Sequence, residues 1–522
     1  MQTLLETYGA KGYLACLRNR YRAGNYTWPQ YALRAAAAYL IDKKPKRAQA
    51  LINTLDAKQL TIKEDAAYAG IIRQINSCAP LPYSDCSLNI IAKNESENIA
   101  AALDSADSYF DEIVICDTGS QDDTCEQAKL YGTVITRDAW HNDFSRARNK
   151  AIDNSSCAWI FWMDADDRID TATFDALVPI WRAGPRRAIA VCVRNQIGGS
   201  APVDFLQVRL FPRRDDIRFE RKIHEQIMFS AVRAGIEFAN VEAVRVIHAG
   251  YHNANDYQDK IKRNQRLIKE ELARTPSDPS LLLALADGYA TLGDIDSATE
   301  TYRQLCDDER AFETNADAFV QAHINLGLLE FRRRNMYEAK RYLYRSLYCD
   351  SARIEAFYLL GRICLSGNDE KEAAEFFIRA SGPKPRLRMT AVNNTMVRLE
   401  SLYYLSELLL KWGNYREMED LLTSALVQYP MVPRFYTQLG KSMFMRRAYK
   451  DAATMFMQSI SLCPAKNDEA YIGIAEIYSA IGDYDSAFNY LNAALSNGGN
   501  PARIHKLRKK IILAQREISP VI

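Results

Sequence analysis

The 522-residue sequence has no excess of charge of either sign and no long apolar run. Lys and Arg total 67 while Asp and Glu total 65, so no net field would attract nucleic acid or an anionic membrane surface. No stretch is apolar for the roughly 18 residues that a transmembrane helix needs. The composition therefore predicts neither a nucleic-acid partner nor stable membrane insertion.

The sequence also lacks a C-x-x-C pair and an apolar leader. Its 11 cysteines are scattered in apolar patterns, as Cys116 and Cys192 are, which is typical of buried free thiols in a reducing compartment. The first residues show no basic segment followed by an apolar one. We therefore expect a soluble cytoplasmic protein.

Three segments of different pattern predict three domains. Residues 1–82 carry apolar residues at helical spacing and predict a helical N-terminal domain, with a boundary marked by Pro80 and Pro82. Residues 83–275 alternate strand and helix patterns. Residues 276–522 hold a repeat array.

The middle segment predicts an α/β domain. Its short apolar and aromatic runs predict strands, and helical patterns separate the first four of them. This alternation predicts a mainly parallel, Rossmann-like sheet with helices on both faces. The predicted strands are Cys86–Ala92, Glu112–Cys116, Gly132–Thr136, Trp159–Met163, Ala188–Val193 and Phe205–Phe211. The predicted helices include Glu97–Ala106 and Asp123–Leu130.

The last segment repeats with a period of about 34 residues. Small residues such as Gly361 and Ala373 recur where two antiparallel helices would approach closely, and prolines such as Pro430 end units. Units begin near residues 279, 320, 354, 399, 433 and 468. The spacing resembles tetratricopeptide repeats, which implies an α-helical solenoid, and residues 502–517 predict a capping helix.

Two carboxylates end the apolar strand that is predicted at Trp159–Met163. Asp164 and Asp166 lie at its carboxyl edge, where ligands bind in open α/β sheets. Such oxygen ligands suit hard divalent cations, which often join carboxylates to substrate phosphates. The alternative is a solvated acidic turn, and the neighbouring motifs argue against it.

Polar clusters follow the other predicted strands as well. They are Lys93–Glu97, Asp117–Thr124 and Trp140–Asn149. Asp117 lies at a strand edge and is well placed to contact a base or ribose. Ser96 and Glu97 fit a helix N-cap equally well.

Four motifs in order resemble family 2 inverting glycosyltransferases of GT-A fold. They are Asn89-Ile-Ile-Ala-Lys-Asn-Glu95, Asp117-Thr-Gly-Ser-x-Asp-x-Thr124, Asn142-Asp-Phe-Ser-x-Ala-Arg-Asn149 and Trp162-Met-Asp-Ala-Asp166. The chain looks most like the bacterial branch that includes SunS-like peptide transferases and flagellin glycosyltransferases with tetratricopeptide repeats. The resemblance implies a GT-A catalytic domain with a mixed sheet.

The resemblance also implies a site for a nucleotide sugar. The residues that would contact it after the strands are Lys93, Glu95, Asp117, Arg148 and Asp164. Asp164 and Asp166 would hold Mn²⁺ or Mg²⁺ against both phosphates, which assists departure of the nucleoside diphosphate. Asp167, one residue past the motif, is given a structural role. The expected donor is a UDP-sugar.

An inverting transfer also needs a base that deprotonates the acceptor. The family places an acidic residue near Ile217–Glu225, so Glu225 is the candidate base. Family members often show Glu-Asp here, whereas this chain has His224-Glu225, which makes His224 the second candidate.

Two further groups lie beyond this region. His248 follows a strand-like run and is expected to complete the metal site, as in related enzymes; the alternative is a packing histidine. Lys260 and Arg263 lie three residues apart on one predicted helix face, so both can point at one diphosphate. The alternative for this pair is a solvated face.

The sequence thus predicts a metal-dependent glycosyltransferase that uses a nucleotide sugar and recruits a protein or peptide acceptor through its repeat solenoid. One alternative is transfer to a lipopolysaccharide or other cell-surface glycan precursor. Another is a non-catalytic scaffold with an inactive transferase domain. The sugar and the acceptor atom (O, S or N) stay open.

Overall fold

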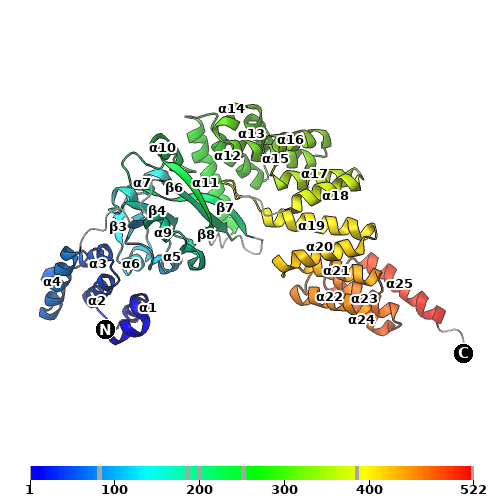
Figure 1. The fold of residues 1–522 in the computed structure, drawn as a ribbon, viewed down its shortest axis with the longest axis horizontal. Helices are drawn as coiled ribbons and strands as arrows, with labels where there is room; N and C mark the ends of the chain where they lie inside the picture. The colour runs from blue at the N-terminus through cyan, green and yellow to red at the C-terminus, as the bar shows by residue number, and fades with distance from the viewer. Residues whose placement is uncertain are drawn as a thin grey trace. The chain divides into compact units, whose positions relative to one another are not determined.

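The computed structural model describes residues 2–78, 85–182, 187–196, 202–248, 254–382 and 387–518. The chain forms two compact units, the first made of Met1–Leu329 with Arg386–Asn393 and the second of Glu330–Pro385 with Asn394–Ile522. The first unit holds the N-terminal helices, the sheet and the first repeat helices (Figure 1). The boundary predicted at Pro80 and Pro82 lies outside the described residues, and the three domain limits stay predictions.

The sheet has eight strands in the order β3-β2-β1-β4-β7-β6-β8-β5. They are β1 (Cys86–Ala92), β2 (Glu112–Asp117), β3 (Val134–Arg137), β4 (Trp159–Asp164), β5 (Asp167–Ile169), β6 (Arg187–Asn195), β7 (Val203–Pro212) and β8 (Glu237–His248). Strands β3, β2, β1 and β4 run parallel, whereas β7 joins β4 antiparallel, so the sheet is mixed. The six predicted strands are confirmed, with small shifts at their ends.

The sequence pattern does not predict β5, and of β8 it predicts only a strand-like run before His248. β5 has only three residues, too few for a pattern, and β8 exposes much of its length and carries charged residues between its apolar ones. The two strands pair antiparallel with each other. This pairing places His248, the last residue of β8, opposite Asp167 of β5.

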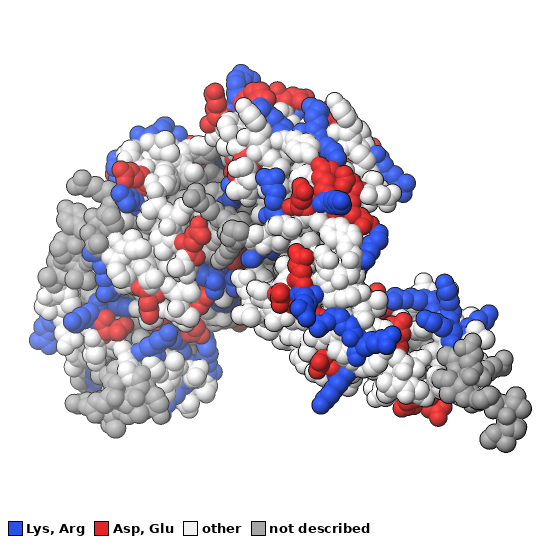
Figure 2. All heavy atoms as spheres, turned by 45° about the vertical axis from the view of Figure 1, so that its right-hand side comes forward, with Lys and Arg blue, Asp and Glu red and all other residues white. Residues whose placement is uncertain are grey.

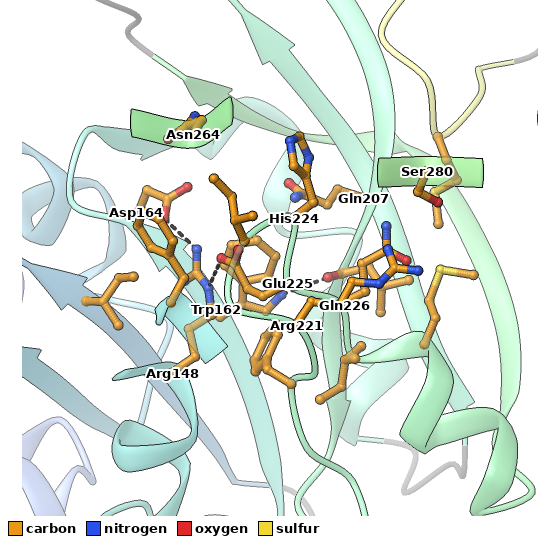
Figure 3. Close-up of a pocket in the computed structure, with 18 of the residues that line it drawn as sticks. Arg148, Trp162, Asp164, Gln207, Arg221, His224, Glu225, Gln226, Asn264 and Ser280 are labelled. Carbon is orange, nitrogen blue, oxygen red and sulfur yellow. Dashed lines mark hydrogen bonds and ion pairs between the residues drawn. The ribbon is translucent and has the colours of Figure 1, made fainter. Parts of the chain in front are cut away.

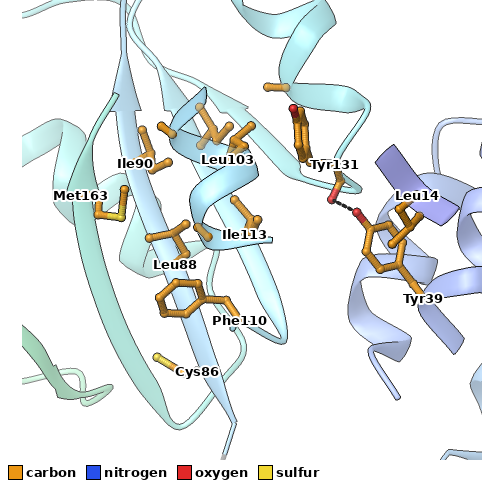
Figure 4. Packing of buried hydrophobic residues seen from close by; sticks show 14 of the residues in the cluster. Leu14, Tyr39, Cys86, Leu88, Ile90, Leu103, Phe110, Ile113, Tyr131 and Met163 are labelled. Atoms are coloured by element: carbon orange, nitrogen blue, oxygen red, sulfur yellow. Dashed lines mark hydrogen bonds between the residues drawn. The ribbon is translucent and has the colours of Figure 1, made fainter. Parts of the chain in front are cut away.

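Helices cover both faces of the sheet, as predicted. Those between the first strands are α5 (Ile99–Ala106), α6 (Thr124–Lys129) and α7 (Phe144–Asp153). Leu103 of α5 packs with Ile90 and Ile113 on one face (Figure 4). Ala147 of α7 packs with Val114 on the other face, because consecutive strand residues point to opposite sides. Further helices of this unit are α8 (Thr171–Phe174), α9 (Val178–Arg182), α10 (Met228–Arg233) and α11 (Ala254–Leu272).

Four N-terminal helices pack at the edge where β2 and β3 begin. They are α1 (Gln2–Arg22), α2 (Trp28–Ile41), α3 (Pro45–Ile52) and α4 (Ile62–Ser77). Arg47 is fully buried and donates to Asp107 Oδ1 at 2.7 Å, and Arg18 donates to Asp107 Oδ2 at 3.1 Å. The Tyr39 hydroxyl donates to the Tyr131 carbonyl at 3.1 Å (Figure 4). Buried ion pairs and hydrogen bonds therefore join these helices to the sheet layer.

The repeat helices follow in pairs, as the 34-residue period predicts. They are α12 (Pro279–Thr291), α13 (Ile295–Asp307), α15 (Ala316–Arg332), α16 (Met336–Cys349), α17 (Ile354–Ser366), α18 (Glu370–Ser381), α19 (Asn394–Lys411), α20 (Tyr415–Gln428), α21 (Pro433–Met445), α22 (Tyr449–Leu462), α23 (Asp468–Ala480) and α24 (Tyr484–Ser496). A short α14 (Arg310–Thr314) interrupts the series, and α25 (Pro501–Ile518) occupies the predicted capping position. A Cβ at Gly361 would lie 2.7 Å from the Phe377 ring, so only glycine lets these two helices pack so closely.

The distribution of charged side chains on the surface agrees with the nearly equal numbers of basic and acidic residues in the sequence. On the face drawn in Figure 2, basic and acidic side chains occur both over the sheet unit and over the repeats. Each helix of the described residues is too short or too polar to span a bilayer.

Candidate active site

A cavity of about 1420 Å³ opens in the first unit at the carboxyl ends of β1 and β4. Lys93 directly follows β1, and Asp164 is the last residue of β4. Residues from β7 and from the segment 219–233 supply further parts of the wall. In Figure 3, Asp164 and Arg148 lie toward one end, and His224 and Glu225 lie next along the cavity.

An acidic cluster lies in this cavity. It consists of Asp164, Asp166, Asp167 and His248, whose ligand atoms lie within 4.8 Å of one another. The β5–β8 pairing places Asp167 directly opposite His248. Nδ1 of His248 lies 2.9 Å from Asp167 Oδ1 and 3.5 Å from Asp166 Oδ1. The structure thus brings together the three predicted metal ligands, and their carboxylates suit Mn²⁺ or Mg²⁺.

Burial and neighbouring charges shift the pKa values of the cluster in opposite directions. Burial would raise the pKa of Asp167, but Arg209, whose Nη1 donates to Asp167 Oδ2 at 2.8 Å, and His248 hold that pKa below its usual range. Burial would lower the pKa of His248, but the hydrogen bond and charge of Asp167 raise it to about 9. Burial raises the pKa of Asp166 to about 6 against the opposing charge of His248, and the nearby Asp164 adds to the rise. A divalent cation would relieve this repulsion between carboxylates.

Arg148 links the acidic cluster to the candidate base. Its Nη2 donates to Asp164 Oδ1 at 2.8 Å, and its Nε donates to Glu225 Oε1 at 2.7 Å (Figure 3). The guanidinium carbon lies 3.9 Å from the centroid of the Trp162 ring, and that of Arg209 lies equally close to the same ring. Two donors of Arg148 are therefore engaged by protein carboxylates, whereas the resemblance implies a contact with the nucleotide sugar.

Glu225 and His224 lie on a short loop that is closed by a β-bridge between Glu220 and Gln226. Arg221 (φ 76°) and His224 (φ 51°) have left-handed backbone conformations, which cost energy and persist where the surroundings impose them. The Glu225 side chain is 11% exposed. His224 is exposed to the cavity; the surrounding protein and the charge of Arg221 lower its pKa, so the ring is neutral at neutral pH.

The other predicted binding residues divide into two groups. Those on the cavity wall are Lys93, Glu95, Lys260 and Arg263. Asp117 is instead buried behind the wall at the end of β2, where its Oδ1 accepts a hydrogen bond from Ser120 N at 3.0 Å. The adjacent Thr118 reaches the cavity.

The structure adds residues that sequence reasoning missed. Asp167, expected to be structural, lies inside the acidic cluster and also orients His248. Arg209 is buried beside it in the apolar strand β7. An arginine in the middle of a buried strand needs a buried partner. The position of Arg209 in the sequence therefore indicates that a buried carboxylate lies nearby.

Comparisons with known proteins assign a family to the sheet domain. The model described as Glycosyl transferase family 2 matches residues 87–244, and a tetratricopeptide-repeat model matches residues 468–497. Residues 87–244 thus form a family 2 glycosyltransferase domain, with tetratricopeptide repeats after it. This confirms the resemblance carried by the four motifs.

Relatives of known sequence match part of the chain. The prophage-derived glycosyltransferase SunS of Bacillus subtilis is 27% identical over 258 residues, which cover 49% of this chain and 60% of SunS. A tetratricopeptide-repeat-containing protein of Synechococcus elongatus is 29% identical over 224 residues, which cover 42% of this chain and 55% of that protein. The chain therefore spans less than two thirds of either relative. Among solved structures, the tetratricopeptide-repeat protein YrrB is 17% identical with a TM-score of 0.30, over 38% of this chain and 96% of that one.

Proposed function

We propose that this family 2 domain transfers a sugar from a nucleotide-diphosphate donor to an acceptor, with a divalent metal and with inversion at the anomeric carbon. The observation that supports this most is the link through Arg148 between Asp164 of the acidic cluster and Glu225. An inverting transfer needs stabilisation of the leaving group and a base for the acceptor. The cavity offers a candidate for each, side by side.

The acidic cluster fits a hard divalent cation. Asp164, Asp166 and His248 would hold Mn²⁺ or Mg²⁺, and Asp167 would orient His248 through the hydrogen bond to its Nδ1. The bound cation would neutralise charge on the departing nucleoside diphosphate. Because Asp167 also accepts a hydrogen bond from Arg209, its carboxylate is itself held in place.

Glu225 is the proposed base. Its carboxylate would take the proton of the acceptor group as that group attacks the anomeric carbon. The hydrogen bond from Arg148 orients this carboxylate. His224 is neutral and next to it on the same loop, so it is the second candidate for this role.

The donor would lie between the acidic cluster and the walls from β1 and α11. Lys260 and Arg263 on α11 would supply positive charge to the diphosphate, and Lys93 and Glu95 would contact the nucleotide. Asp117 would act from behind the wall, by holding the Ser120 turn against the nucleoside. A UDP-sugar is the proposed donor.

We propose that the repeats bind the acceptor. Solenoids of this kind present extended surfaces, and a linked module raises the effective concentration of a bound acceptor. We therefore infer a protein or peptide acceptor and place the reaction in the cytoplasm.

A panel of nucleotide sugars, assayed for hydrolysis by the full chain, tests the proposal. We expect slow hydrolysis of one donor class with Mn²⁺ or Mg²⁺, and its loss in excess EDTA. Equal hydrolysis in EDTA would contradict the metal role. No hydrolysis of any donor, with metal present and the protein folded, would favour the scaffold alternative.

A further inference from the structure

The cavity is larger than a nucleotide sugar requires. Sites for small ligands usually measure about 300–1,000 Å³, whereas this one measures about 1420 Å³. In Figure 3 it continues from Asp164 past His224 and Glu225 toward Ser280, the second residue of α12. We call this continuation the distal arm, and its wall includes Gln207, Arg221, Phe229, Val232, Ser280 and Met389.

Part of the distal arm is built from a segment that is remote in sequence. Residues 387–393 lie between α18 and α19 in the chain but pack in the unit that contains the sheet. Leu387 is buried in one apolar cluster with Leu206, and the Leu206 N–H donates to the Arg388 carbonyl at 2.6 Å. This segment thus lies along β7 beyond the point where β4 stops pairing with it, since β4 pairs only with residues 210–212.

The same segment has a second anchor on the repeats. The backbone N–H and the hydroxyl of Thr390 donate to Asp317 Oδ2 at 2.8 and 2.6 Å. Met389 lies between the two anchors, lines the cavity and is 40% exposed. An apolar side chain held this way at a cavity wall suits contact with a ligand better than it suits the core.

The chemistry of the distal arm is mixed. Gln207 and Gln226 line the cavity with amides that can both donate and accept hydrogen bonds. Arg221 forms an ion pair with Asp278, yet its buried Nη1 has no hydrogen-bond partner among the described atoms. A buried guanidinium N–H without a partner is costly, so this donor calls for an oxygen acceptor from a ligand.

Exposed apolar groups alternate with these polar ones. Val232 on α10 is 61% exposed and, like Met389 and Phe229, it faces the cavity. Amides, an unpaired N–H donor and separate apolar contacts together match a polypeptide backbone with its side chains. The backbone offers a carbonyl and an N–H at each residue, and its side chains can fill apolar sites.

We propose that the distal arm binds an extended polypeptide segment of the acceptor, with Arg221 on a backbone carbonyl and with Val232 and Met389 on its side chains. This inference rests on the proposed function and specifies the acceptor of that same site. The bound segment leads to Glu225, where the side chain that receives the sugar gives up its proton. The segment 387–393, which lies between two repeat helices in the chain, is therefore part of the acceptor site.

Other acceptor classes fit this wall less well. A lipid-linked acceptor needs a continuous apolar lining and positive charge for its phosphates. The distal arm instead contains both Arg221 and Arg233 and both Asp278 and Asp317, so its formal charges cancel. A balanced, polar wall is what an uncharged peptide backbone requires.

A binding experiment tests the site without relying on catalysis. The photoreactive residue p-benzoylphenylalanine is placed at position 389 of the full chain, and a pool of short synthetic peptides with a central Ser, Thr or Cys is the probe. The control places it at position 62, where Ile62 is 92% exposed on α4. We expect peptide adducts at 389 well above those at 62, and equal labelling at the two positions would overturn the proposal.

A transfer experiment tests the role of the exposed apolar contacts. Val232→Glu and Met389→Glu should each lower the ratio of peptide transfer to donor hydrolysis by about tenfold or more, mainly through KM, since each removes one apolar contact. Ile62→Glu is the matched control and should leave the ratio unchanged. Unchanged ratios in the first two variants, or transfer to glycan acceptors but not to peptides, would overturn the proposal.

The two proposals can fail separately. Peptide adducts at 389 without hydrolysis of any nucleotide sugar would refute the proposed reaction and keep the peptide site. Metal-dependent hydrolysis without adducts at 389 would keep the reaction and refute the peptide site.

Discussion

Asp164 and Glu225 accept hydrogen bonds from the same guanidinium group, that of Arg148, at 2.8 and 2.7 Å. A guanidinium is planar and rigid, so it sets the distance and direction between the two carboxylates. One of them belongs to the proposed metal site, and the other is the proposed base. Arg148 thus couples the two halves of the proposed chemistry.

Replacing Arg148 tests this coupling. Lys has one charged nitrogen on a flexible chain and cannot hold both carboxylates, so Arg148→Lys should lower the rate of transfer by about tenfold or more. The double variant Arg148→Lys/Glu225→Gln should be hardly slower than Glu225→Gln, because coupled residues give non-additive effects. Arg146→Lys is the control, since Arg146 is exposed and pairs with Asp138. If the losses in kcat of the two single variants add up in the double variant, the coupling through Arg148 is refuted.

Glu225→Gln should remove the base but keep the site. The amide oxygen can still accept from Arg148, so donor affinity should stay near normal while the rate of transfer falls by about 10²–10⁴-fold. Donor binding by calorimetry and transfer by mass spectrometry separate these effects. Glu220→Gln, on the same loop, is the control. Normal transfer by Glu225→Gln together with its loss in His224→Ala would move the role to His224.

Asp166→Asn should abolish metal-dependent turnover without unfolding the chain. Asp166 has one of the raised pKa values of the cluster and is a proposed ligand, so donor hydrolysis should fall by about 10²-fold or more, and excess Mn²⁺ should restore little of it. Glu242→Gln on β8 provides an exposed acidic control on the strand that carries His248. Wild-type hydrolysis by Asp166→Asn would rule out this ligand.

The attachment of the N-terminal helices should weaken in acid. Burial would raise the pKa of Asp107, but Arg47 and Arg18 lower it below the ordinary value of 3.8. A carboxylate with a lowered pKa adds stability above its ordinary value and loses it as the pH falls below that value. Asp107→Asn removes the carboxylate partner of buried Arg47, whereas Arg18 keeps its ion pair with Asp104 at 3.2 Å, and it should cost about 3–5 kcal/mol at neutral pH.

Thermal melting between neutral pH and pH 3 measures this effect. The wild-type transition should fall more steeply below pH 3.8 than that of Asp107→Asn, and the exposed Asp65→Asn should follow the wild type. Parallel curves for the wild type and Asp107→Asn would show that this ion-pair network contributes nothing.

Gly440→Ala should destabilise the repeats although alanine favours helix. Its Cβ would lie 2.7 Å from the buried Phe456 ring, and such overpacking costs about 1–3 kcal/mol. Gly70→Ala on α4 is the control, because a Cβ there meets nothing within 4 Å and should stabilise the helix by about 0.5–1 kcal/mol. Urea denaturation followed by circular dichroism distinguishes these signs, and a Gly440→Ala variant as stable as wild type would contradict the close packing.

Local sequence patterns were sufficient to predict many of the strands and helices. The sequence predicts both ends of the strand at Cys86–Ala92, because the segment is largely apolar, with only Ser87 and Asn89 as polar residues. The repeat helices were predicted from recurring small residues, since Gly361 and Gly440 fall at the same position of their units and mark close helix contacts. Of β8, only the end before His248 was predicted, because the first half of that strand is exposed and has no apolar pattern.

The sequence by itself determined the carboxylate pair, because Asp164 and Asp166 lie two residues apart where one strand ends. It also determined the repeats, whose contacts are between neighbours in the chain. Only the tertiary structure decided that His248 and Asp167 meet, since β5–β8 pairing joins them, and that Arg148 holds Glu225. The same holds for Met389, which reaches the cavity from between two repeats. Contacts between distant residues depend on strand order and loop path, which no local periodicity encodes.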